Sequence, residues 1–210
     1  MSKMFNNNSQ PERRSIKPLE DLIVAIFFAQ SEIIKTPNGR ELKFNLAKRK
    51  HELFNSYIQR NGLVNHIKFN PEKLEGRIKQ SILLEKMLRD WTIDGEVHAV
   101  DPRYVKTSMF LLWICLFARK TKASVAIDTN LPELTREDIP YHFSNYFDTK
   151  MYSKGSSFYI KPFHSVVTRS IQTQILAIEN VELNYLLPEN EELSFKKKMA
   201  EWEECNTNGY

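Results

Sequence analysis

Two aspartates stand where the sequence could support metal chemistry. Asp101 and Asp128 each follow an alternating segment, at 96–100 and 123–127, and a helical stretch lies between the two segments. If the segments are parallel strands of a small β-α-β unit at 96–128, both carboxylates lie at the strand ends where α/β sheets bind ligands. Two carboxylates there could hold Mg²⁺ for phosphoryl transfer. The sequence favours a simpler interpretation, in which Asp101 caps a helix and Asp128 begins a turn.

Other catalytic motifs are incomplete in this sequence. His51-Glu52 starts like a zinc-binding helix motif, but Asn55 stands where the second histidine is needed. Lys154-Gly155 lacks the remaining glycines of a phosphate-binding loop and indicates a turn. Ser165, beside His164, is placed to cap a helix. The sequence therefore predicts no catalytic residue, no cofactor and no metal, and hence a protein that is not an enzyme.

Positive charge is concentrated in the first part of the chain. Residues 1–90 carry a net charge of +7, whereas residues 91–210 carry −3. The basic residues that could contact phosphates are Arg13, Arg14, Lys43, Lys48, Arg49 and Lys50. Because Glu41 and Glu52 lie among them, the sequence favours a solvated face or pairing with the chain's own acidic end. Nucleic-acid binding through residues 13–89 is the alternative function.

Two apolar sets are candidates for protein binding. Phe195, Met199 and Trp202 follow the i, i+4, i+7 spacing of a helix that docks in a groove, either on its own domain or on another chain. The second set is aromatic and comprises Tyr141, Phe143 and Tyr146. The sequence favours core packing for this second set.

The elements that must position these residues are predicted to be mainly helices. Hydrophobic periodicity indicates six of them, from Pro18 to Thr36 and at 41–60, 71–92, 102–120, 164–187 and 190–203. Two or three short strands are expected between residues 96 and 161, with the β-α-β unit among them. No internal repeat is apparent at periods of 20–50 residues. The predicted fold class is therefore mainly α.

Length and composition favour one globular domain. The 210 residues are 41% hydrophobic, with an expected disordered arm at 1–14, a domain at 15–204 and a flexible tail at 205–210. Two distant cysteines suggest no disulfide framework and favour the cytoplasm. The longest apolar run, 109–118, is shorter than the ~20 residues of a membrane span. The sequence thus predicts a soluble, non-enzymatic adaptor or accessory subunit that binds other protein chains.

Overall fold

The computed structural model describes residues 10–93, 96–97, 101–173 and 179–207, and its first half is built around a four-stranded sheet. The elements follow one another as α1 (Gln10–Phe28), β1 (Ser31–Thr36), β2 (Gly39–Asn45), the 3₁₀ turn η1 (Lys48–Lys50), α2 (His51–Arg60), η2 (Val64–His66), β3 (Ile67–Asn70), β4 (Glu75–Ile78) and α3 (Ile82–Trp91). The strands are antiparallel and lie in the order β1-β2-β4-β3.

The second half repeats this arrangement. After the short ribbon of β5 (Thr92–Ile93) and β6 (Glu96–Val97) and the turn η3 (Pro102–Tyr104), the elements are α4 (Thr107–Phe117), β7 (Ala118–Lys120), β8 (Val125–Asp128), α5 (Glu133–Ser144), β9 (Lys150–Lys154), β10 (Ser157–Lys161) and α6 (His164–Thr173). The strand order, β7-β8-β10-β9, matches that of the first sheet. The chain is therefore a structural tandem, completed by α7 (Glu179–Leu186), η4 (Glu189–Glu191) and α8 (Glu192–Thr207).

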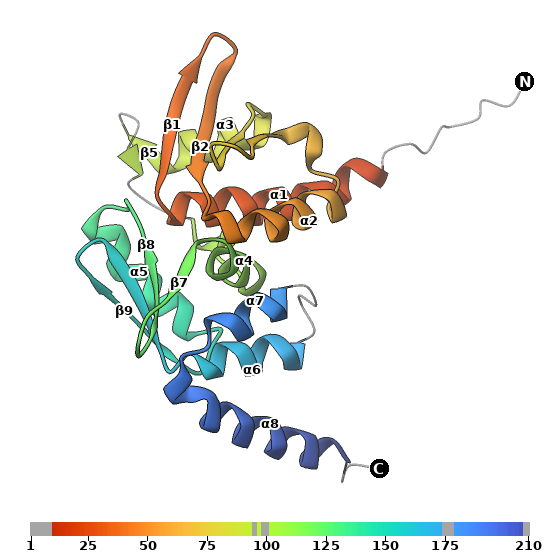
Figure 1. The fold of residues 1–210 in the computed structure, drawn as a ribbon. Helices are drawn as coiled ribbons and strands as arrows, with labels where there is room; N and C mark the ends of the chain where they lie inside the picture. Colours follow the sequence, from red (N-terminus) through yellow and green to blue (C-terminus); the bar gives the residue numbers. More distant parts are fainter. Residues whose placement is uncertain (1–9, 94–95, 98–100, 174–178, 208–210) are drawn as a thin grey trace, which may run out of the picture.

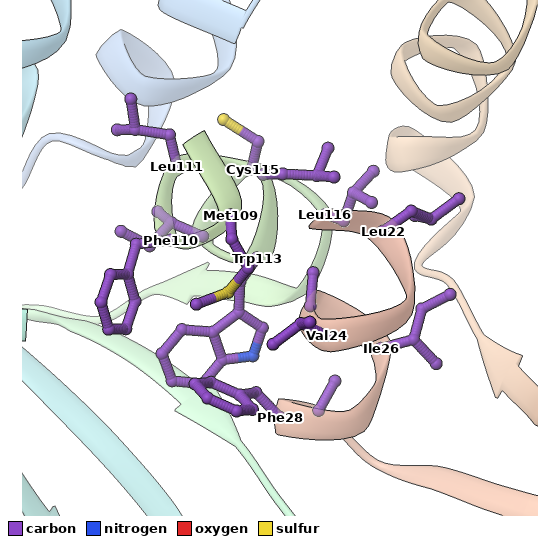
Figure 2. Packing of buried hydrophobic residues seen from close by; sticks show 14 of the residues in the cluster. Leu22, Val24, Ile26, Phe28, Met109, Phe110, Leu111, Trp113, Cys115 and Leu116 are labelled. Atoms are coloured by element: carbon purple, nitrogen blue, oxygen red, sulfur yellow. The ribbon is translucent and has the colours of Figure 1, made fainter. Parts of the chain in front are cut away.

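Helices α1 and α4 join the two halves (Figure 1). Both are buried around their whole circumference, over 22–28 in α1 and 109–116 in α4, and Figure 2 shows their side chains packed against each other. The Phe28 and Trp113 rings meet edge to face at 5.5 Å, and Trp113 reaches Phe158 of the second sheet at 5.4 Å. Apolar burial of this kind is the main force that holds the halves together.

Each sheet turns one face to the helices and leaves the other open. In the first sheet Leu42, Phe44 and Ile78 are buried on the same face, which the register between β2 and β4 brings together. In the second sheet Ile127 and Phe158 are paired in the same way. Because strand side chains alternate, the residues between these positions point to the opposite, open face.

The predicted mainly α fold class is wrong, and the largest error lies at residues 18–60. Helix α1 ends at Phe28, and β1 and β2 form a hairpin over 31–45 where helices were expected. The turn at 37–38 therefore joins two strands. Glu41, Leu42, Lys43 and Phe44 alternate between polar and apolar, which is the pattern of a half-buried strand.

The predicted β-α-β unit is also wrong, and so is the first half of the helix predicted at 71–92, whereas its second half contains α3. Strand β8 is antiparallel to both β7 and β10, and β6 pairs with β5, so the segments at 96–97 and 125–128 belong to different sheets. Residues 98–100 lie outside the described residues. Asn70 does not start a helix; its Oδ1 accepts hydrogen bonds from the backbone of Glu72 and Lys73 in a turn. Helix α3 begins only at Ile82.

Other expectations agree with the structure in part. The segments at 123–127 and 157–161 contain strands β8 and β10, and the last predicted helix corresponds to α8. The arm at 1–14 and the tail at 205–210 fall partly outside the described residues, with α1 starting at Gln10 and α8 reaching Thr207. Within the described part of the chain, every helix is too short or too polar to cross a membrane.

Candidate nucleic-acid interface

The open face of the second sheet, here called the basic face, is built by the strand register. Tyr159 of β10 lies opposite Tyr152 of β9 and Ala126 of β8, so the three share a face. Continuing the alternation along each strand gives the whole set, which is Arg119, Ala126, Asp128, Lys150, Tyr152, Lys154, Ser157, Tyr159 and Lys161.

The basic face carries four cations and one carboxylate. Lys150, Lys154 and Lys161 are exposed, and none of the ion pairs found among the described residues involves them. Arg119 pairs with Asp128, with an Nη2–Oδ1 distance of 3.3 Å. The face therefore has a formal net charge of +3, and its three lysines are available to neutralise phosphate groups.

Two tyrosines lie among these cations. The rings of Tyr152 and Tyr159 are stacked, with centroids 5.4 Å apart and planes inclined by 14°. Tyr152 is 47% exposed. A stacked pair offers flat apolar surface and hydroxyl groups that can hydrogen-bond to phosphate or sugar oxygens. Cations and tyrosine hydroxyls on one rigid sheet are the chemistry of a polyanion-binding surface.

Asp128 is held as an ionised anchor for Arg119. Burial raises the pKa of Asp128, but a hydrogen bond of 2.6 Å from the Ser157 hydroxyl and the contact with Arg119 outweigh it, leaving the pKa below its usual value. The hydrogen bond with Asp128 in turn raises the pKa of Arg119. The guanidinium is thus fixed at the strand edge nearest α4.

The open face of the first sheet, here called the ladder face, has different electrostatics. Alternation places on it Glu32, Ile34, Thr36, Glu41, Lys43, Asn45, Lys68, Asn70, Glu75 and Arg77. Its charged residues pair with one another, both across the strands and within β4. Lys43 lies 3.8 Å from Glu32 and 3.2 Å from Glu75. Arg77 lies 2.8 Å from Glu75.

Glu41 completes this ladder of ion pairs. It is only 7% exposed although it lies on the open face, and its carboxylate is 3.3 Å from Lys68 and 4.0 Å from Arg77. Hydrogen bonds from Arg77 and Lys43 hold the pKa of Glu75 below its usual value. Three cations and three carboxylates thus cancel, and the ladder face has no formal net charge.

The two sheets meet where α1 and β8 end. The Asn130 side chain, just after β8, donates a hydrogen bond of 2.5 Å to the carbonyl of Ser31, the first residue of β1. This contact ties the first residue of β1 to the segment that follows β8. The two sheets are therefore in contact where the repeats join.

The basic residues predicted from the sequence are scattered by the fold. Lys43 lies on the ladder face, while Lys48 is exposed in η1. Lys50 is buried, and its ammonium contacts the Cys115 carbonyl and the Glu182 carboxylate. Arg49 contacts the same carboxylate. Arg13 and Arg14 lie in α1, within the range Gln10–Phe28.

The residues proposed for protein binding are mostly packed within the chain. Phe143 is fully buried, and the Tyr146 hydroxyl donates to the Val105 carbonyl at 2.8 Å, whereas Tyr141 is 71% exposed. Helix α8 packs on α6. The three residues predicted to dock, Phe195, Met199 and Trp202, are half-buried. The contacts described for this stripe are with its own domain.

The two aspartates considered for magnesium belong to separate structures. Asp101 caps η3 by accepting a hydrogen bond of 2.9 Å from the Arg103 backbone, and it also pairs with the Arg103 side chain. Asp128 lies in the second sheet with Arg119 and Ser157. No cluster of three or more histidine, cysteine or acidic side chains suited to a metal is found in the described part of the chain.

Comparison with known proteins identifies the fold. No protein family and no curated protein matches the sequence. Among solved structures, the chain is similar to the homing endonuclease I-WcaI bound to its DNA recognition sequence, with a TM-score of 0.54 and 12% sequence identity over 86% of this chain and 94% of that one. The chain has a homing endonuclease-like α/β fold. Because it covers 86% of the chain, the likeness extends over both repeats.

This homing endonuclease-like fold corrects the main function predicted from the sequence. The prediction of a non-enzymatic adaptor is contradicted, because the protein that shares the fold is an endonuclease bound to DNA. The alternative, nucleic-acid binding, agrees better with it. The basic face lies outside residues 13–89, and the sequence analysis did not indicate it because the net charge of −3 over residues 91–210 concealed the lysines of β9 and β10.

Proposed function

We propose that this protein binds double-stranded DNA through the open faces of its two sheets, with the basic face supplying most of the affinity. The observation that carries the proposal is the set of exposed lysines at 150, 154 and 161, which surrounds a stacked tyrosine pair on a rigid sheet. The fold adds support, because the similar structure is an endonuclease bound to its DNA recognition sequence.

The lysines are spaced for contact with a phosphate backbone. Lys150 and Lys154 lie at the two ends of β9, and Lys161 lies opposite Lys150 across the register. At about 3.3 Å per residue, Lys150 and Lys154 are separated by roughly 13 Å along the strand. Phosphates on one DNA strand recur about every 6–7 Å, so the face spans two or three of them.

The test is the salt dependence of DNA binding. Fluorescence anisotropy with a labelled 30-base-pair duplex of random sequence measures the association constant K at several salt concentrations. Each phosphate contact contributes about 0.9 to the magnitude of the slope of log K against log salt concentration. The variant K150Q/K154Q/K161Q should bind more weakly and lower that magnitude by about 2–3.

A matched control separates local contacts from overall charge. The variant K86Q/K196Q/K197Q removes three charges from exposed lysines on α3 and α8, away from the sheets. It should keep a slope close to that of the unmodified protein. Equal losses in both triple variants, or no binding by the unmodified protein at low salt, would refute the proposal.

Strand cleavage is a second candidate, because the similar structure is an endonuclease. Asp128 favours it as an ionised carboxylate on the basic face, beside the cations that would hold the DNA. Incubation with supercoiled plasmid and Mg²⁺ tests this, since nicked or linear product that is absent for D128N would support cleavage. Plasmid that is bound but stays supercoiled would count against cleavage and leave the binding proposal intact.

A further inference from the structure

The two open faces occupy equivalent places in the two repeats but differ in charge. The basic face carries four cations and one carboxylate, whereas the ladder face carries three of each. The cations of the ladder face are already paired, and Lys43 has carboxylates on both sides. The two halves of a DNA site would therefore meet different chemistry.

We propose that the three carboxylates of the ladder face, Glu32, Glu41 and Glu75, determine specificity by opposing non-specific contact with DNA. This inference rests on the proposed function and assigns different tasks to the two sheets. The basic face supplies affinity for phosphates, and the ladder face admits DNA only where base edges offer compensating hydrogen bonds.

The physical reason is the limited chemistry open to a carboxylate beside DNA. It repels phosphate oxygens. Because an ionised carboxylate can accept hydrogen bonds but not donate them, it can pair on base edges only with amino groups such as N4 of cytosine. The carboxylates also form ion pairs with the cations that would otherwise contact phosphates. Because each ladder cation already has a partner, exchanging that partner for a phosphate gains little.

The position of Glu41 supports a role at this surface. Its side chain lies on the open face, between Lys68 and Arg77, and yet it is 7% exposed. Glu75 is fixed by two cations, Lys43 on the neighbouring strand β2 and Arg77 on its own strand β4. These contacts fix the carboxylates before DNA arrives, which is the pre-organisation that a discriminating contact needs.

The test removes the negative charges while keeping the side-chain shapes. In E32Q/E41Q/E75Q the ladder face gains a net charge of +3, equal to that of the basic face. Three additional phosphate contacts should steepen the salt slope by about 2–3, which corresponds to roughly 100-fold tighter binding of a random-sequence 30-base-pair duplex near 0.15 M salt. In selection from a random duplex library, the variant should enrich sequences with fewer constrained base pairs than the unmodified protein does.

Two further variants make the result interpretable. E133Q/E137Q/D138N makes the same charge change at exposed positions of α5 and should tighten binding much less. E32Q/E75Q leaves the buried Glu41 in place, so it tests the idea if the triple variant does not fold. Its expected gain is smaller, with a slope steeper by about 1–2.

The outcomes separate this inference from the proposed function. If the lysine variant of the basic face loses DNA binding but the ladder variants bind random DNA no more tightly than the α5 control, the division of tasks is wrong and DNA binding stands. If the unmodified protein does not bind DNA and the lysine variant changes nothing, both proposals fail.

Discussion

Gly76 of β4 offers a sharp test of the packing beneath the ladder face. A Cβ atom at this position would lie 2.2 Å from Cζ of Phe44, and 2.6 and 2.7 Å from its two Cε atoms. The Phe44 ring is buried and packs edge to face on Phe54 and Phe117, with centroid distances of 5.4 and 6.3 Å. It would have to move by more than 1 Å to reach an ordinary contact distance.

We expect Gly76→Ala to destabilise the protein by about 1–3 kcal/mol, because overpacking a fixed core costs that much. Replacing a strand glycine gains back roughly 0.5–1 kcal/mol in chain entropy, which is included in this range. Phe44→Leu alone should cost about 1–2 kcal/mol, since it leaves a space in the core. In the double variant the smaller leucine accommodates the new methyl group.

The measurement is a double-mutant cycle by urea unfolding followed by circular dichroism. The double variant should be more stable than the sum of the single changes predicts by at least about 1 kcal/mol. A matched control combines Gly76→Ala with Phe158→Leu, a buried ring of the other sheet, and should be additive. Additive free energies for Gly76→Ala with Phe44→Leu would show that the two residues do not meet as described.

Two further predictions concern buried charges. Glu182→Gln should destabilise the protein by about 3–5 kcal/mol in thermal or urea unfolding, because it leaves the buried Lys50 ammonium without its carboxylate. Lys50→Met should cost less, because Glu182 keeps its contact with Arg49 and no buried charge is left unpaired; equal costs for both changes would contradict this. Burial raises the pKa of Asp21 despite a 2.7 Å hydrogen bond from Ser108. The folded state therefore binds the Asp21 proton more tightly than the unfolded state does, which stabilises the protein at low pH. This stabilisation is lost as the pH rises through the folded-state pKa. Asp21→Asn should therefore reduce the fall in stability as the pH rises above about 4, the ordinary pKa of an aspartate, and an unchanged slope in pH-dependent unfolding would count against it.

The central helices show how far the sequence could predict this fold. The apolar stretches around Ile26 and Leu112 are buried on every side, and periodicity identified both as core helices. The end of α1 was missed because Ile33 and Ile34 continue the helical spacing, although they belong to β1. Strand β1 is stabilised by its pairing with β2. The spacing of apolar residues within one segment carries no information about such a pairing.

The basic face was missed for a related reason. The net charge of a long segment conceals this face, because the acidic residues after residue 178 outnumber the lysines of two short strands. Lys150, Tyr152 and Lys154 stand at every second position, as do Tyr159 and Lys161, and that alternation is the signal that places them on one face of a sheet. That the residues of β9 and β10 share one face depends on the register between the two strands, which cannot be read from the sequence.

The most direct test of the central claim is lysine footprinting by mass spectrometry, with and without a 30-base-pair duplex at low salt. Acetylation rates report which lysine side chains DNA covers. We expect protection at Lys150, Lys154 and Lys161, with unchanged rates at Lys86 and Lys196. Protection at the two control lysines, or unchanged rates at all three lysines of the basic face when the duplex is bound, would contradict the assignment of this face as the DNA-binding surface.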